Sequence, residues 1–214
     1  MYGFLIGFTA ILSTLFAEKL IKVRKINISS NEFWNLVIVI FILSIAGGRM
    51  YHVIDNWEFY KQNLLKIFNL WEGGLGIFGS LFFILVFLYL YSKKFNKKML
   101  IYSDLLCFFA PYLIIAGRVG NYFNKELKQS FYEIFLMLVM SGFLLLNYKK
   151  IHFGKGIITY FFLIFYGVVR IVVEPFRKID NSFILYKVNL TYVFSIFLIF
   201  VGFGIMYFTR KKSK

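Results

Sequence analysis

The chain alternates between long apolar segments and short polar connections. Seven segments are predominantly apolar, and they cover residues 2–17, 33–54, 74–92, 100–116, 132–147, 156–174 and 190–208. A membrane-spanning helix takes about 20 such residues, so each segment predicts one span, and the shorter ones predict a tilted or locally thinned setting. The pattern therefore predicts an all-α, polytopic membrane protein with seven transmembrane helices in a single domain, 1–214.

Composition agrees with this pattern. The chain is 60% hydrophobic and 16% charged, with 29 Phe and 15 Tyr in 214 residues. A soluble domain of this length cannot bury so many apolar side chains. The single cysteine, Cys107, lies in an apolar segment, cannot form an intramolecular disulfide, and is expected to pack as a small hydrophobe.

The net charge of +15 is unevenly distributed. Of the 25 Lys and Arg residues, 15 fall in the alternate connections 18–32, 93–99 and 148–155 and in the C-terminal tail. The positive-inside rule assigns these connections to the cytoplasm, which places the N-terminus outside and the C-terminus inside. The charge is thus explained by membrane topology, and no nucleic-acid partner is expected.

The first apolar segment resembles the core of a signal peptide. No basic residue precedes it, however, and the Lys/Arg cluster follows it. This order is the reverse of a secretory signal, so we expect a retained helix with its N-terminus outside.

The polar residues of greatest chemical interest lie at the other ends of the predicted helices. They are Arg49, Glu72, Arg118, Asn121, Glu126, Arg170, Glu174 and Arg177. The topology places all of them in the outer half of the bundle. Charges within membrane helices are costly and normally face the bundle interior, so they are functional candidates.

Spacing in "YFFLIFYGVVRIVVEPFRK" places Tyr166, Arg170 and Glu174 on one helix face, with Arg177 three residues later. Pro175 is expected to end or kink the helix. One interpretation is an Arg170–Glu174 pair that only joins helices. The other is a phosphate site, because four arginines at this end, including Arg49, outnumber the nearby acids, and a planar guanidinium binds phosphate oxygens bidentately.

Four glycines and one histidine each have two interpretations. Gly73, Gly74, Gly76 and Gly79 permit close backbone approach, either around a cavity or in ordinary helix packing. His52 lies three residues after Arg49 and is an alternative candidate for a base, although a packing or interfacial role is the favoured interpretation.

Five motifs occur in a characteristic order. They are "GGRMYHVI", "LWEGGLGIFGSL", "DLLCFFAPYLIIAGRVGNYFNKEL", "SFYEIF" and "YGVVRIVVEPFRKID". In this order they resemble the prolipoprotein diacylglyceryl transferases, and "GRVGNYFNKEL" is similar to the most diagnostic signature of that family. The resemblance covers nearly the whole chain, from Tyr2 to the last helix.

The resemblance implies a seven-helix enzyme of the bacterial cytoplasmic (inner) membrane whose active site faces the outer, periplasmic side. Such an enzyme transfers the diacylglyceryl group of phosphatidylglycerol to the thiol of a lipobox cysteine in a prolipoprotein. A thioether forms and glycerol phosphate leaves. The implied partners are phosphatidylglycerol, the lipobox peptide and membrane lipids, and the family implies no cofactor and no metal.

The resemblance also implies roles for individual residues. It assigns catalytic roles to Arg118, Glu126, Arg170 and Glu174, the arginines stabilising charge on the departing phosphate. The two glutamates are candidates for taking the thiol proton or for orienting an arginine. It assigns binding of phosphatidylglycerol to Arg118, Asn121, Tyr2, Arg49, Tyr166, Arg177, Gly73 and Gly74.

The chain departs from the family at two places. Phe78 stands where many members have histidine, and only Lys128 and Gln129 separate "NKEL" from "SFYE", where the family carries a longer segment. These departures leave open a non-catalytic, lipid-binding or lipid-moving paralogue. A transporter would also explain buried charges, but the sequence shows no internal repeat.

Overall fold

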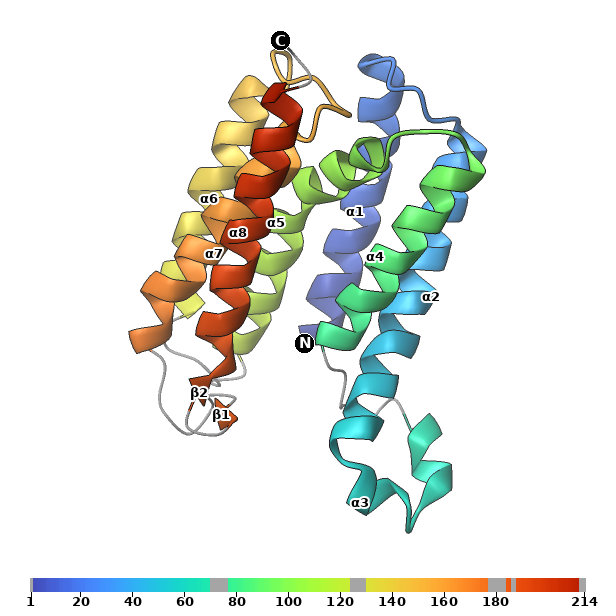
Figure 1. Ribbon diagram of the computed structural model, residues 1–214, viewed down its shortest axis with the longest axis vertical. Helices are drawn as coiled ribbons and strands as arrows, with labels where there is room; N and C mark the ends of the chain where they lie inside the picture. The colour runs from blue at the N-terminus through green and yellow to red at the C-terminus, as the bar shows by residue number, and fades with distance from the viewer. Residues whose placement is uncertain (1, 70–76, 124–129, 177–183, 186–187, 212–214) are drawn as a thin grey trace. The chain divides into compact units, whose positions relative to one another are not determined.

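A helix occupies each of the seven apolar segments of the sequence (Figure 1). The computed structural model describes residues 2–69, 77–123, 130–176, 184–185 and 188–211. Within these residues the long helices are α1 (Tyr2–Val23), α2 (Ser30–Asp55), α4 (Ile77–Lys94), α5 (Met99–Phe123), α6 (Ser130–Asn147), α7 (Ile157–Val173) and α8 (Leu190–Lys211). Short elements are α3 (Trp57–Tyr60), the 3₁₀ turns η1 (Leu64–Phe68) and η3 (Glu174–Phe176), and an antiparallel pair of two-residue strands, β1 (Ile184–Leu185) and β2 (Val188–Asn189).

Five of the described helices are long and apolar enough to cross a membrane. The candidate spans are Phe4–Val23, Ser30–Ile54, Met99–Gly120, Ile157–Phe176 and Thr191–Lys211, and Phe131–Asn147 is a shorter apolar helix. This confirms a helical architecture of the membrane type. The count of seven spans and the orientation of the termini stay predictions.

The chain packs as two compact units. Unit 1 comprises Met1–Ile26 and Leu100–Lys214, and unit 2 comprises Asn27–Met99. The prediction of one domain over residues 1–214 stays a prediction.

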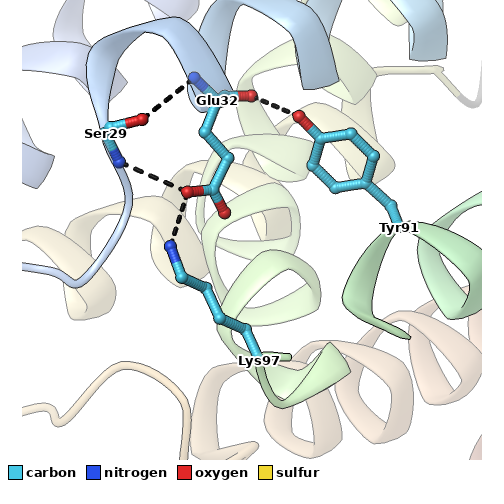
Figure 2. A network of polar contacts seen from close by, with 4 residues as sticks. All are labelled: Ser29, Glu32, Tyr91 and Lys97. Atoms are coloured by element: carbon cyan, nitrogen blue, oxygen red, sulfur yellow. Dashed lines mark hydrogen bonds and ion pairs between the residues drawn. The ribbon is translucent and has the colours of Figure 1, made fainter. Parts of the chain in front are cut away.

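In unit 2, α2 and α4 run in opposite directions and are joined at both ends. At one end a Cβ added to Gly47 would lie 2.6 Å from the Gly79 carbonyl oxygen, so the two backbones touch. At the other end the Tyr91 hydroxyl donates a hydrogen bond to the Glu32 carbonyl (2.8 Å), and Glu32 also pairs with Lys97 (Figure 2). Ser29 and Glu32 form a capping box that starts α2 and satisfies backbone N–H groups that lack helical partners.

In unit 1, a buried carboxylate supports the start of α7. Asp104 of α5 is fully buried and accepts hydrogen bonds from the backbone N–H groups of Gly154 (2.8 Å), Gly156 (2.9 Å) and Thr159 (2.9 Å), and from the Thr159 hydroxyl (2.7 Å). Gly156, the residue before α7, has a φ of 75°, which favours glycine. Asp104 thus replaces the side chain that a helix N-terminus normally uses as its cap.

The rest of unit 1 packs closely through small residues. Helices α7 and α8 lie side by side (Figure 1), and a Cβ at Gly167 would lie 2.8 Å from the Ser195 carbonyl oxygen.

The side chain of Arg24, just after α1, donates a hydrogen bond to the Ile151 carbonyl (3.0 Å). Two of the basic connections therefore meet at one end of unit 1.

Helix α1 extends six residues beyond the predicted apolar segment, to Val23. The extra turns contain an ion pair between Lys22 and Glu18 (2.9 Å) and the buried side chains of Leu20 and Ile21. Helical side chains four apart face each other, so the charged residues that suggested a loop also stabilise a helix.

Candidate active site

Four charged side chains from three helices and one turn of unit 1 form a continuous ion-pair network. Arg118 Nε of α5 lies 2.9 Å from Glu133 Oε2 of α6. Arg170 Nη1 of α7 lies 3.4 Å from the same oxygen, and Arg170 Nη2 lies 3.6 Å from Glu174 Oε2. Two guanidiniums therefore converge on a single carboxylate oxygen.

The network is largely withdrawn from solvent. The side chains of Glu133 and Glu174 are 3% exposed, while those of Arg118 and Arg170 are 20% and 16% exposed. An apolar cluster formed by Met137, Val169, Val173 and their neighbours packs in the same region of α5, α6 and α7. Charges held in such surroundings interact more strongly than at a surface, and losing one partner leaves a buried charge uncompensated.

The sequence of α7 explains how Arg170 and Glu174 meet. They are four residues apart, and the prediction that they share a face is confirmed by their ion pair. The α-helix ends at Val173 and continues as the 3₁₀ turn η3, so the helix end expected from Pro175 is also confirmed. Glu174 nevertheless keeps helical backbone angles (φ −57°, ψ −40°), against the usual preference of a residue before proline.

Tyr166 lies one turn before Arg170 on the same face. Its side chain packs against the apolar cluster of Met137, Val169 and Val173. Its ring stacks on Phe162, with centroids 5.6 Å apart. The structure therefore brings together four of the residues predicted from the sequence: Arg118, Tyr166, Arg170 and Glu174.

The network lies far from the basic connections of unit 1. Asp104, near the start of α5, contacts the connection that precedes α7, whereas Arg118 is fourteen residues further along the same helix. At 1.5 Å per residue this is about 21 Å of helix. The network and the Arg24–Ile151 contact are thus at opposite ends of the unit.

Glu133 belongs to the network but is not among the residues predicted from the sequence. It lies in "SFYEIF", one of the motifs that carry the resemblance, and it is not among the residues assigned above to the outer half of the bundle. In the described part of unit 1, Arg118 and Arg170 are matched by Glu133 and Glu174, so the argument from excess positive charge does not hold for this pair. The signal was present, because a carboxylate at the start of the apolar run "IFLMLVM" is costly unless it is paired.

Arg49 belongs to unit 2 and has a different set of contacts. Its Nε donates a hydrogen bond to the Ile67 carbonyl (2.7 Å), Nη2 donates to the Lys66 carbonyl, and the guanidinium lies 5.4 Å from the centre of the Tyr60 ring. These contacts attach the segment 57–68 to the end of α2. A role of Arg49 in binding lipid stays a prediction.

Other predicted site residues lie outside what the structure describes. Asn121 and Tyr2 belong to α5 and α1, but their side chains, like that of Phe78, are not among the described ones. Glu126, Arg177, Gly73 and Gly74 lie outside the described residues altogether. Their roles stay predictions.

Apolar helices of spanning length, together with an arginine–carboxylate network buried between them, define an integral membrane protein with a candidate site for a phosphate-bearing lipid. The model of the family "Prolipoprotein diacylglyceryl transferase" matches residues 1–208, and the chain belongs to this family. The resemblance seen in the motifs is thereby confirmed, as is the assignment to the transferases of lipoprotein biosynthesis.

Curated relatives carry the same activity in their names. The chain is 30% identical to the phosphatidylglycerol–prolipoprotein diacylglyceryl transferase of Buchnera aphidicola subsp. Acyrthosiphon pisum (strain Tuc7), over 94% of this chain and 90% of the relative. It is 31% identical to the protein of that name from Finegoldia magna, over 94% and 87%, and 30% identical to that from Streptococcus pneumoniae (strain ATCC 700669 / Spain 23F-1), over 86% and 80%. The alignment with the Buchnera protein spans 254 positions, whereas this chain has 214 residues. The Buchnera protein therefore has at least 40 residues in the aligned region that have no counterpart in this chain.

Proposed function

We propose that this protein transfers the diacylglyceryl group of phosphatidylglycerol to the thiol of a lipobox cysteine in a prolipoprotein. The carbon–oxygen bond between the diacylglyceryl group and the phosphate breaks, a carbon–sulfur bond forms, and glycerol phosphate leaves. The observation that carries this proposal is the convergence of Arg118 and Arg170 on one oxygen of Glu133, in a chain that belongs to the transferase family.

The arginines supply the electrostatic part of the reaction. Negative charge builds on the phosphate oxygen as its bond to carbon breaks, and two preorganised guanidiniums stabilise that charge in surroundings with little water. A planar guanidinium also binds two phosphate oxygens at once, which orients the ester for attack by sulfur. Arg118 and Arg170 are therefore the catalytic residues of the proposal.

The carboxylates hold those arginines in place. Glu133 contacts both guanidiniums, and Glu174 fixes the second Nη atom of Arg170. The other oxygen of Glu133, Oε1, is buried and has no hydrogen-bond partner among the described residues. It is therefore an acceptor for a donor on the substrate, such as a hydroxyl of the headgroup. Glu126 stays the candidate for taking the thiol proton.

The same proposal includes seven spans in a bacterial cytoplasmic membrane, with the N-terminus outside and the active site on the outer side. Two features support it. Basic connections meet at one end in each unit, through Arg24 and Ile151 in unit 1 and through the loops at Glu32 and Lys97 in unit 2. In unit 1 the arginine network lies at the opposite end, as the positive-inside rule requires for an outward-facing site.

The test is reconstitution of the purified protein with phosphatidylglycerol and a short lipobox peptide. We expect the peptide to gain the mass of one diacylglyceryl group while glycerol phosphate is released in equal amount. Arg118→Ala and Arg170→Ala should abolish both signals without affecting membrane insertion, and Arg118→Lys should also be poor because a point charge lacks the guanidinium fork. Arg210→Ala, at an exposed arginine of α8, is the matched control.

The outcomes separate the proposal from its alternative. Normal transfer by either alanine variant, at equal amounts of folded protein, would reject the assigned roles. No transfer by the unmodified chain, while a relative is active under the same conditions, would favour the non-catalytic, lipid-binding paralogue.

A further inference from the structure

A groove between α2 and α4 of unit 2 lies outside the site described above. Its volume is about 360 Å³. The lining side chains include Asn35, Ile38, Val39, Phe87, Leu90 and Lys94. A groove of this size is within the range that holds part of a lipid-sized ligand.

Polarity changes along the length of this groove. Because α2 and α4 run in opposite directions, Asn35 and Lys94 lie near the end where Glu32 meets Tyr91. Ile38, Val39, Phe87 and Leu90 lie one to two turns further toward the Gly47–Gly79 crossing. The groove therefore has apolar walls and a polar, basic end, which is the distribution of an amphiphile with one headgroup.

The charge at the polar end favours an anionic headgroup. Glu32, the acid nearest to this end, is already paired with Lys97. Lys94 lines the groove, its side chain is exposed, and its described contact is with the Phe95 ring, at 5.8 Å. Lysines beside a membrane attract anionic lipids at about 1 kcal/mol each, roughly a fivefold preference.

We infer that this groove binds one acyl chain of a phospholipid whose anionic headgroup is held by Lys94 and Asn35. With the orientation proposed above, this lipid belongs to the cytoplasmic leaflet and is distinct from the lipid consumed in the reaction. Binding needs neither Arg118 nor Arg170, so failure of this inference and failure of the proposed transferase activity are distinguishable.

The test places a fluorescent reporter in the groove. The reporter is Phe87→Trp in a chain whose native tryptophans (Trp34, Trp57 and Trp71) are replaced by Phe, reconstituted in phosphatidylcholine vesicles. Dibrominated phosphatidylserine is compared with dibrominated phosphatidylcholine as a quencher. We expect half-maximal quenching at an about fivefold lower mole fraction of the phosphatidylserine. Phe95 also lines the groove, and Phe95→Trp is the second reporter, should Phe87→Trp fail to fold.

Two lysine variants decide whether Lys94 is responsible. Lys94→Gln should remove the preference for the anionic lipid, while Lys93→Gln should retain it, because Lys93 lies over the Tyr89 ring and does not line the groove. Equal quenching by the two lipids would overturn the inference. So would an equal loss of preference in both lysine variants, which indicates general surface charge. Quenching by neither lipid would show that protein covers the groove, and would overturn it as well.

Discussion

Replacing Glu133 by glutamine tests the central feature of the candidate site. Glutamine keeps the size of the side chain and one acceptor oxygen, but it removes the negative charge that faces Arg118 and Arg170. In place of the lost charge it brings an amide that donates hydrogen bonds toward two guanidiniums that are themselves donors. The variant therefore isolates the ion pairs from packing.

The expected cost follows from burial. The Glu133 side chain is 3% exposed and lies 2.9 and 3.4 Å from two arginine nitrogens. Removing one partner of a buried pair typically costs about 3–5 kcal/mol, and because glutamine retains the shape we expect the lower end, about 3 kcal/mol. The arginines also lose their orienting group, so we expect the transfer rate to fall by about 100-fold, as when one electrostatic donor is removed from an active site.

The assay has a stability arm and an activity arm. Unfolding free energy is measured in detergent, and transfer to a lipobox peptide is measured at equal amounts of folded protein. Glu58→Gln is the matched control, because it makes the same chemical change at the surface pair with Lys61, where the Glu58 and Lys61 side chains are 84% and 44% exposed. An exposed pair of this kind contributes about 0.5 kcal/mol or less.

A double-mutant cycle checks that the cost arises from the pairs. Arg170→Met should cost less in the Glu133→Gln background than in the native chain, with a coupling of about 0.5–3 kcal/mol. The reasoning would be refuted if Glu133→Gln had the same unfolding free energy and the same transfer rate as the Glu58→Gln control. That result would mean that the network neither stabilises the bundle nor positions the arginines.

Three further predictions concern the parts of the fold that support the site. Gly47→Val should destabilise the protein by about 3 kcal/mol in thermal unfolding, because its side chain meets the Gly79 carbonyl. The control is Gly142→Ala in α6, which has nothing within 4 Å and should stabilise the protein by about 0.5–1 kcal/mol through helix propensity. Asp104→Asn should cost about 3 kcal/mol in the same assay, because it removes the buried charge that caps α7, and an unchanged melting curve would contradict that role. Arg49→Met should speed hydrogen exchange in residues 57–68 and leave exchange in α5 unchanged, because Arg49 binds the Lys66 and Ile67 carbonyls. If residues 57–68 exchanged at the same rate in the variant and in the native chain, the anchoring role would be contradicted.

Much of this protein was predictable from its sequence. Apolar runs predicted helices because a backbone in lipid must satisfy its own hydrogen bonds, and a helix does so within one segment. The spacing of Arg170 and Glu174 predicted their contact, because residues four apart on a helix are always neighbours. The end of the α-helix beside Pro175 was also expected, although Glu174 keeps helical backbone angles against the usual preference of a residue before proline. The motifs identified the family by their residue types and order, and not by helix geometry, because they contain the residues that the family's chemistry needs.

Contacts between helices were decided by the tertiary structure alone. Glu133 joins Arg118 and Arg170 only because α5, α6 and α7 present these side chains toward one another. Asp104 reaches backbone N–H groups at least 50 residues away, which no local pattern indicates. Such contacts depend on how each helix is rotated about its axis. That rotation results from the packing of two surfaces at once, so it cannot be derived from either helix alone.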